Sequence, residues 1–480
     1  MKTPSLSILL AFLYVLFVFS SCSKKTVQDK LNQVNNGDGE VSVWLTTSDQ
    51  SSLFKNQNNR LSFKGAPGGS SVSILVDDSK SFQSMDGFGY CLTGGSAMHI
   101  YKMEKSARQA LLKELFTTDA NNIGISYLRV SIGASDLDEK PFSYNDLPPG
   151  ETDPELKKFS LDPDRKYLIP LLKEIISLYP DIKILGSPWS PPTWMKTNNQ
   201  SKGGSLKPEW YDAYARYFVK YIQGMKAEGI RIDAITVQNE PLHPGNNPSL
   251  LMVADAQADF VKNHLGPVFK EAGIDTKIII YDHNADRPDY PISILDDPDA
   301  RKYIDGSAFH LYAGKIDALS DVHNAHPDKN LYFTEQWIGA PGNFPEDLKW
   351  HVRELIIGAT RNWCKTVLEW NLAADPQQRP YTDGGCNECL GALTIDGNNV
   401  KRNPAYYIIA HASKFIRPGS LRIESSVSAD LPNVAFKTPS GQIVLIVVNN
   451  SREARSFNIG FKGKFTSASL NSGSVATFVW

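Results

Sequence analysis

The sequence predicts an α/β fold: a (β/α)8 TIM barrel with a β-sandwich side domain built from both chain ends. Three observations lead to this prediction. Eight short β-rich runs recur over roughly 330 residues, amphipathic stretches lie between most of them, and alternating apolar and polar segments flank this region on both sides. A chain of 480 residues is long enough for one large domain and a smaller companion.

The β-rich runs and the helical stretches alternate along the middle of the chain. The runs lie at 85–90, 125–133, 182–189, 234–240, 277–284, 307–312, 331–337 and 366–372. Helices are expected at 104–116, 165–178, 209–226, 257–272, 345–360 and 404–415. A doubly wound open sheet is the alternative, but no G-x-G-x-x-G motif follows the first run, and eight repeats suit closure better. We therefore expect the barrel to span residues 81–416.

The segments outside the barrel have the pattern of antiparallel strands. They lie at 41–47, 71–76, 434–437, 443–449, 456–461 and 475–480, separated by Gly, Pro, Asn and Ser. Because they occur on both sides of the barrel, we expect residues 41–80 and 417–480 to form one β-sandwich.

Composition and charge exclude several classes of protein. Hydrophobic residues make up 41% and charged residues 21%, a balance that argues against wholesale disorder. The 50 Lys and Arg are matched by 52 Asp and Glu, so no basic excess favours a nucleic-acid partner. Five cysteines are too few for a disulfide scaffold. Cys386 and Cys389 form a C-x-x-C without a second pair, which leaves a local disulfide or two free thiols, and no zinc site.

The first 22 residues have the features of a targeting segment. Lys2 precedes an apolar run at 8–19, which is too short to span a bilayer. The run leads through small residues to Cys22 and resembles a bacterial lipobox; an ordinary secretory signal is the alternative. We predict a lipoprotein signal peptide at 1–22, a lipid on Cys22 and a flexible tether at 23–40. The protein would then be anchored in the bacterial cell envelope, on the outer membrane surface or the periplasmic side, with no other contact to a membrane.

Polar and aromatic residues gather where the predicted barrel strands end, which is where barrel enzymes carry their active sites. They are Arg129, Trp189, Asn239, Glu240, Asp282, His283, His310, Tyr312, Glu335 and Trp370. Salt bridges at the barrel mouth would explain only one or two of these residues. Two glutamates facing one cavity suit glycoside hydrolysis, in which one acid protonates the leaving oxygen while the other is ionised. Pro241 ends the fourth strand abruptly and would hold Glu240 at the rim.

Several motifs resemble glycoside hydrolase family 30, which contains lysosomal-type glucosylceramidases and microbial β-1,6-glucanases. The motifs are SPWSPPTWMKT at 187–197, DGFG at 86–89, Arg129 with the segment 132–136, TVQNEP at 236–241 and FTE at 333–335. The resemblance covers about residues 80 to 480. It implies that Glu240 is the general acid/base and Glu335 the nucleophile.

The resemblance also implies further site residues. Asp136, Trp189, Asn239 and Trp370 would hold a glucose unit, His310 and Tyr312 match a His-x-Tyr motif in which Tyr312 orients Glu335, and Asn387 falls near a sugar-contacting Asn. We expect Arg129 to hydrogen-bond Glu240 or Asn239, and Asp282 to lie nearby. Two positions depart from the glucosylceramidase pattern: Leu311 replaces a Trp, and Trp337 stands two residues after the nucleophile. Both affect the side where the leaving group would lie.

Together these features predict a retaining glycoside hydrolase that cleaves β-glucosidic bonds, with an endo-β-1,6-glucanase acting on external polysaccharide favoured. A glucosylceramidase with the same chemistry is the alternative, and a non-catalytic glycan-binding lipoprotein is less compatible with two glutamates. No metal or organic cofactor is expected, because both reaction steps need only carboxyl groups. We expect Glu335 to ionise readily and Glu240 to have a raised pKa, because two negative charges nearby disfavour each other.

Overall fold

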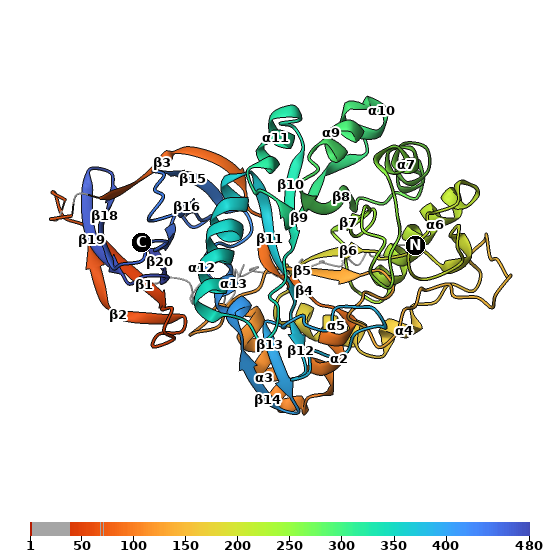
Figure 1. Cartoon of the computed structure of the whole chain (residues 1–480), viewed down its shortest axis with the longest axis horizontal. Coiled ribbons are helices and arrows are strands. Elements are labelled where there is room, and N and C mark those ends of the chain that lie inside the picture. Colours follow the sequence, from red (N-terminus) through yellow and green to blue (C-terminus); the bar gives the residue numbers. More distant parts are fainter. Residues whose placement is uncertain (2–38, 68, 71) are drawn as a thin grey trace. The chain divides into compact units, whose positions relative to one another are not determined.

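The computed structural model describes residues 1, 39–67, 69–70 and 72–480; Cys22, predicted to carry a lipid, lies outside them. Eight parallel strands close into a barrel in the order β10-β11-β4-β5-β6-β7-β8-β9. The strands are β4 (Gly87–Cys91), β5 (Tyr127–Ser131), β6 (Lys183–Ser187), β7 (Ala234–Thr236), β8 (Lys277–Ala285), β9 (Ile304–Gly314), β10 (Asn330–Glu335) and β11 (Cys364–Asn371). Each overlaps one predicted run, so the TIM barrel is confirmed (Figure 1).

Helices follow the barrel strands, and all of them except the last, α13, connect one barrel strand to the next. They are α2 (Gly94–Lys102), α3 (Lys105–Phe116), α4 (Asp162–Arg165), α5 (Leu168–Leu178), α6 (Tyr211–Ala227), α7 (Ala254–Phe260), α8 (Gly266–Glu271), α9 (Asp289–Asp296), α10 (Pro298–Arg301), α11 (Ala318–Ala325), α12 (Phe344–His351) and α13 (Pro404–Ser413). The single helices predicted at 257–272 and 345–360 each contain a π-helical segment, at Val261–Leu265 and Val352–Ala359. Sequence patterns did not predict α2, α9, α10 and α11, each of which has nine residues or fewer.

Both ends of the described chain contribute strands to one nine-stranded sheet, as predicted. Its order is β19-β18-β3-β15-β16-β17-β20-β1-β2. The strands are β1 (Glu40–Thr46), β2 (Lys55–Ser62), β3 (Ser73–Ser84), β15 (Leu421–Ser425), β16 (Asn433–Lys437), β17 (Ile443–Val448), β18 (Arg455–Phe461), β19 (Lys464–Leu470) and β20 (Val475–Val479). The sequence analysis missed β2, β15 and β19. The outermost two, β2 and β19, are rich in small or polar residues and each pairs with one neighbour of the sheet.

Helix α13 packs against this sheet through aromatic and hydrogen-bonding side chains, and in Figure 1 it is seen between the sheet and the barrel strands. The ring of Trp44 lies 4.9 Å from that of Phe54 and 5.5 Å from that of Phe415. His411 of α13 hydrogen-bonds Thr477 of β20 and Thr46 of β1. Helix α13 and the nine-stranded sheet therefore share one buried interface.

A small sheet lies between β11 and α13 in the sequence. It consists of β12 (Ala373–Ala374), β13 (Leu393–Asp396) and β14 (Asn399–Arg402). The segment 375–392, which joins β12 to β13, reaches the mouth of the barrel, as its contacts below show.

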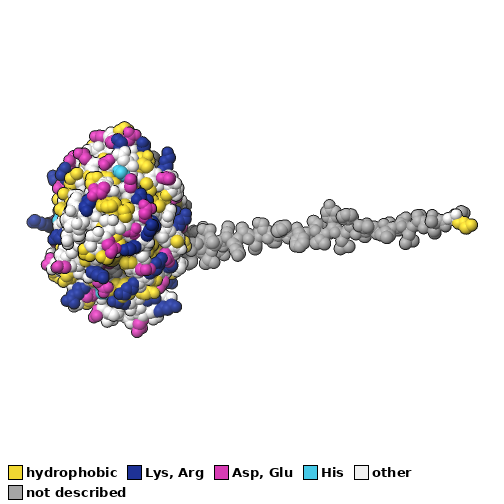
Figure 2. Space-filling view, turned by 90° about the vertical axis from the view of Figure 1, so that its right-hand side faces the viewer, with side chains coloured by type: hydrophobic (Ala, Val, Ile, Leu, Met, Phe, Trp, Pro, Cys, Tyr) yellow, Lys and Arg dark blue, Asp and Glu magenta, His cyan; other side chains and the backbone are white. Residues whose placement is uncertain are grey.

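Acidic and basic side chains are interspersed over the face of the molecule in Figure 2, in keeping with a net charge of −2. Among the residues that the structure describes, no helix combines the length and the apolar character needed to cross a membrane.

Candidate active site

Two layers of side chains fill the barrel, an apolar one beneath a polar one. The apolar layer takes one side chain from each of seven strands: Tyr127, Leu185, Ala234, Ile279, Ala308, Tyr332 and Leu368. Because residues two apart in a strand face the same side, the next layer toward the carboxyl ends is found two residues further on. On six strands these residues are Arg129, Ser187, Thr236, His310, Thr334 and Trp370, all of them buried. The strand period thus brings the polar groups together.

Strand β8 departs from this period and thereby adds a carboxylate. Its pairing with β9 shifts register between Tyr281 and His283, and Tyr281 and Asp282 have positive φ values of 69° and 72°. Such a bulge redirects a side chain, and positive φ is costly for residues other than glycine. Asp282, three residues after Ile279, therefore reaches the polar layer.

Arg129 is the cation at the centre of this layer. It donates hydrogen bonds to Asn239 Oδ1 at 2.6 Å, to Asp282 Oδ2 at 2.8 Å and to Ser187 Oγ at 3.1 Å, and it forms an ion pair with Glu335. Asn239 is one of the two partners expected for Arg129, whereas the carboxylates that Arg129 contacts are those of Asp282 and Glu335, not that of Glu240. Since burial opposes its charge, Arg129 keeps a raised pKa only because Asp282 and Glu335 surround it.

Aromatic rings cover the other side of Arg129. Its guanidinium lies 4.8 Å from the centre of the Trp189 ring and 5.8 Å from that of Trp370. The two tryptophan rings are 5.4 Å apart. Arg129 therefore stabilises the positions of both tryptophan rings through cation–π contacts.

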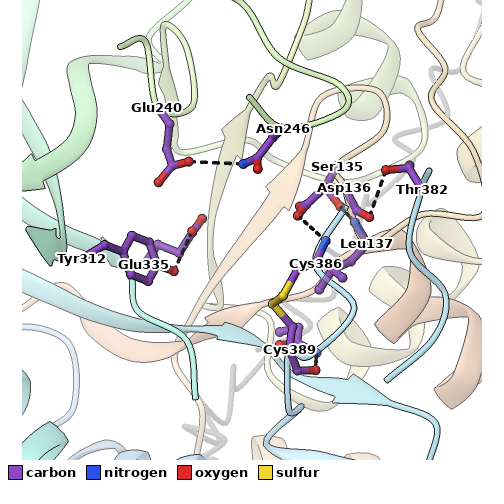
Figure 3. Close-up of a disulfide and its surroundings, with 11 residues drawn as sticks. Ser135, Asp136, Leu137, Glu240, Asn246, Tyr312, Glu335, Thr382, Cys386 and Cys389 are labelled. Atoms are coloured by element: carbon purple, nitrogen blue, oxygen red, sulfur yellow. Dashed lines mark hydrogen bonds between the residues drawn. A yellow bond between two sulfur atoms is a disulfide. The ribbon is translucent and has the colours of Figure 1, made fainter. Parts of the chain in front are cut away.

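Glu335 and Glu240 approach the mouth from β10 and from the segment that follows β7. Tyr312 donates from its hydroxyl to Glu335 Oε1 at 3.0 Å, and Asn246 donates to Glu240 Oε2 at 3.3 Å (Figure 3). Strand β7 ends at Thr236 and not at Glu240 as predicted. Beyond it the chain leaves the ladder, and the backbone N–H of Glu240 donates to the carbonyl of Asp282 at 2.9 Å.

His310 lies between the carboxyl groups. Its Nδ1 is 3.2 Å from Glu240 Oε1 and its Nε2 is 3.1 Å from Asp282 Oδ1. Burial lowers its pKa, but Glu335, Asp282 and Glu240 outweigh burial and raise the pKa to about 9. Both ring nitrogens therefore carry protons at neutral pH and donate to carboxylates.

The charge of His310 reverses the pKa order expected for the two glutamates. Burial raises the pKa of Glu240, but the neighbouring His310 cation outweighs burial and lowers it. Burial also raises the pKa of Glu335, and there His310 and Arg129 do not fully offset it. The prediction of a raised pKa for Glu240 and an easily ionised Glu335 is thus wrong. That prediction took the two glutamates into account but not His310, which lies between them.

A carboxylate oxygen of Glu240, a ring nitrogen of His310 and a carboxylate oxygen of Glu335 lie within 4.8 Å of one another. This short separation matches retaining glycosidases, whose carboxyl groups are about 5–5.5 Å apart, rather than inverting ones at about 6.5–9.5 Å. Three such groups could also hold a divalent cation. Each of them already has protein hydrogen-bond partners, however, and the hydrolysis of a glycoside by two carboxyl groups requires no metal.

A cavity of about 320 Å³ opens above these groups. Of the predicted site residues, it is lined by Asp136, Trp189, Glu240, Tyr312, Glu335, Trp337 and Trp370. Asn239, His310, Arg129 and Asp282 are buried around the two glutamates, as their contacts above show. Asn387 does not line the cavity: it is exposed on its loop, and its neighbours Cys386 and Cys389 face the cavity instead.

Four further residues that sequence patterns did not indicate line the cavity, namely Leu242, His243, Asn246 and Asn284. His283, one of the residues expected at a strand end, lines it as well. Leu242, His243 and Asn246 come from the loop that follows β7, and Asn284 lies near the end of β8. Closeness to Glu240 or Asp282 along the chain was their only signal. Burial lowers the pKa of His283 to about 4, so this ring is neutral.

Comparisons with known proteins agree with this geometry. Residues 85–416 match the glycosyl hydrolase family 30 TIM-barrel domain, and residues 419–478 match the family 30 beta sandwich domain. An endo-1,6-beta-D-glucanase of Aspergillus fumigatus is 35% identical over 446 residues, 86% of this chain and 89% of that protein. The lysosomal acid glucosylceramidase of Mus musculus is 30% identical over 414 residues, 80% of this chain and 78% of that protein.

The solved structure of an endo-beta1,6-glucanase superposes with a TM-score of 0.86 at 35% identity, covering 92% of this chain and 99% of the other. The family models together span most of the chain, and the relatives cover 80% to 92% of it. The chain therefore belongs to glycoside hydrolase family 30, a family of retaining enzymes, and is a glycoside hydrolase.

Proposed function

We propose that the enzyme cleaves β-1,6-linked glucan within the polysaccharide chain, with Glu335 as nucleophile and Glu240 as acid/base. The observation that carries the proposal is the close approach of two differently held carboxyl groups in one cavity. Relatives at 35% identity that are named endo-1,6-β-glucanases support the choice of linkage. Trp337 lines the cavity two residues after Glu335 and offers a surface on which a further sugar ring can stack.

Glu335 is suited to attack the anomeric carbon. Its Oε2 is held by Arg129 and its Oε1 by the Tyr312 hydroxyl, so its orientation is fixed from two sides. The Arg129 charge favours the anion, which is the form that attacks.

Glu240 receives its proton from His310. The contact of 3.2 Å between His310 Nδ1 and Glu240 Oε1 places one proton between the two groups. When a sugar expels water from the cavity, the neutral pair of imidazole and carboxylic acid becomes favoured over the ion pair. Glu240 then protonates the leaving oxygen, and in the second step it accepts a proton from the attacking water.

Two substitutions separate the roles. Glu335→Gln removes the attacking anion, so hydrolysis of both glucan and an activated aryl β-glucoside should be lost. Glu240→Gln removes the proton donor, so the aryl glucoside should still glycosylate Glu335, and azide should restore turnover by attacking without a base. Glu369→Gln is the matched control, because Glu369 is a buried barrel glutamate paired with His351.

Azide rescue of Glu335→Gln with a dead Glu240→Gln would show that the two roles are exchanged. A panel of β-glucans with a synthetic glucosylceramide beside them tests the linkage. Release of short oligosaccharides from the β-1,6-glucan supports the proposal. Turnover of glucosylceramide without turnover of any glucan would replace it.

We further propose that a lipid on Cys22 anchors the enzyme at the bacterial cell envelope. The apolar run and the small residues before Cys22 support this location. Fractionation of cells that express the full chain should place the enzyme in the membrane fraction, and Cys22→Ala should release it. Equal release of both forms would contradict the anchor.

A further inference from the structure

Cys386 and Cys389 form a disulfide, with their Cα atoms 5.7 Å apart. Residues 382–390, here called the disulfide loop, lie in the segment that joins β12 to β13. In Figure 3 the disulfide and Asp136 lie on one side, and Glu240 and Glu335 lie on the other. All of these residues line the same cavity, so the disulfide is part of the wall around the sugar site.

The first half of the loop holds Asp136. The backbone N–H of Cys386 donates to Asp136 Oδ2 at 3.2 Å, and the N–H of Thr382 donates to the Asp136 carbonyl at 2.9 Å. A Cβ atom on Gly385 would come within 2.4 Å of that carbonyl oxygen, so the approach is close. Within the described part of the chain, no residue besides Cys386 donates a hydrogen bond to the Asp136 carboxylate from elsewhere in the sequence.

The second half of the loop is bound to the segment that follows Glu335. Ala340 donates its N–H to the carbonyl of Glu388 at 2.7 Å, and Leu390 donates to that of Ile338 at 2.9 Å. Cys389 forms a β-bridge with Gly339. The disulfide therefore links the half of the loop that holds Asp136 to the half that is bound beside the nucleophile strand.

We propose that the Cys386–Cys389 disulfide is a positioning element that holds the Asp136 carboxylate in place for the sugar. This rests on the proposed function and on the role that the family resemblance implies for Asp136, which is to hold the glucose unit. Neither sulfur touches a reacting atom, so the disulfide acts on substrate binding and leaves the chemical step alone. Its sulfurs also lie in one apolar cluster with Trp337 and Trp370, which form the neighbouring wall.

The position of Asp136 depends on this hydrogen bond because its surroundings oppose its charge. Burial and the nearby Glu335 raise the pKa of Asp136 to about 7, and the Cys386 N–H acts in the opposite direction. Opening the disulfide frees Cys386 to move away, which leaves the carboxylate buried near a second acid without its partner.

The test uses dithiothreitol, which converts the disulfide into two thiols while it is itself oxidised to a cyclic disulfide. The full chain is assayed with an aryl β-glucoside before and after reduction, alongside the double variant Cys386→Ser/Cys389→Ser. In both cases we expect KM to rise about tenfold while kcat stays within about twofold. Reoxidation should restore the wild type and leave the double variant unchanged.

Asp136→Asn provides the control that separates positioning from general loosening. If the disulfide acts through Asp136, this variant has a high KM already, and reduction should raise it no further. Thermal melts check that reduction leaves the protein folded at the assay temperature. An unchanged KM after reduction, or an equal fall in kcat, would overturn the proposal. An oxidised wild type that hydrolyses neither the aryl glucoside nor glucan would instead overturn the proposed function.

Discussion

The barrel mouth and the interface between barrel and sheet each contain a fully buried histidine, and the two regions shift the pKa of that histidine in opposite directions. His310 at the mouth has a pKa raised to about 9, whereas burial lowers that of His411 at the interface to about 3. His310 contacts carboxylates through both nitrogens. Among the described residues, the ring nitrogens of His411 hydrogen-bond only the hydroxyls of Thr477 and Thr46. Equal burial thus leaves His310 charged and His411 neutral, because their neighbouring groups differ.

The hydrogen bonds of His411 also define its neutral tautomer. Thr477 donates its hydroxyl proton to the carbonyl of His411 at 3.0 Å, so its oxygen accepts from Nδ1–H. Nε2 then accepts from the Thr46 hydroxyl at 2.8 Å. A proton added to Nε2 would leave the Thr46 hydroxyl proton without its acceptor, which opposes protonation at this interface.

The largest effect is expected from Arg129→Met, which removes the cation of the mouth. Asp282 and Glu335 would remain buried without their partner, and this costs about 3–5 kcal/mol of unfolding free energy. Activity should be lost with it, because Glu335 loses the charge that favours its anion. Urea unfolding and aryl glucoside turnover measure the two effects.

Arg361→Met is the matched control at the sheet side, because in the described part of the chain Arg361 hydrogen-bonds only neutral groups of Asn433 and Ser425. Arg361→Met should lower the free energy of unfolding by less than Arg129→Met does, and it should leave turnover unchanged. Equal losses of stability in the two variants would remove the distinction between the charged mouth and the neutral interface.

The next largest effect concerns the stability of the fold at low pH. His411 has a lower pKa in the folded state than its ordinary value of 6.5, so the unfolded chain binds one more proton between about pH 6.5 and 3. Stability should fall as the pH is lowered through this window, by at most about 1.4 kcal/mol per pH unit for this group. His411→Gln should flatten that part of the curve, as measured by urea unfolding at several pH values. A curve of unchanged slope would show that His411 contributes nothing to acid unfolding.

A smaller change in stability, with the opposite dependence on pH, is expected at high pH. The pKa of His310 is raised to about 9, so its stabilising charge is fully present below pH 6.5 and is lost as the pH rises through 9. Stability should decline over this range in the wild type and change less in His310→Gln. Because the same proton serves Glu240, hydrolysis of substrates with poor leaving groups should decline over the same range. An alkaline decline of the same size in His310→Gln would assign it to another group.

The smallest effects come from two matched threonines. Thr477→Val removes the acceptor of His411 Nδ1–H and should cost about 1–3 kcal/mol without changing turnover. Thr334→Val removes a donor to Asp282 Oδ1 at the mouth, at a similar cost, and should also lower turnover. Chemical unfolding and steady-state kinetics on both variants check this pair. Lower turnover in Thr477→Val would mean that the interface is coupled to the site.

Sequence patterns predicted the barrel and the position of its glutamates. Strand and helix periods are local, since each depends on neighbouring residues of the same element, and eight repeats were readable without any contact information. Asn239, Glu240 and Glu335 could be placed because they belong to short motifs at the end of β10 or shortly after β7. The strands β2 and β19 could not, because their polar sequences become strands only through pairing with a partner distant in the chain.

Only the tertiary structure decided how the site is charged and held. The bulge at Tyr281 and Asp282 brings an additional carboxylate to Arg129, and His310 between Asp282 and Glu240 sets the order of the glutamate pKa values. The sequence left open whether Cys386 and Cys389 are bonded, and could not reveal that Asp136 depends on them. The physical reason is the same in each case. A pKa or a hydrogen bond depends on all groups within a few ångströms, and here those groups come from strands and loops that lie far apart in the sequence.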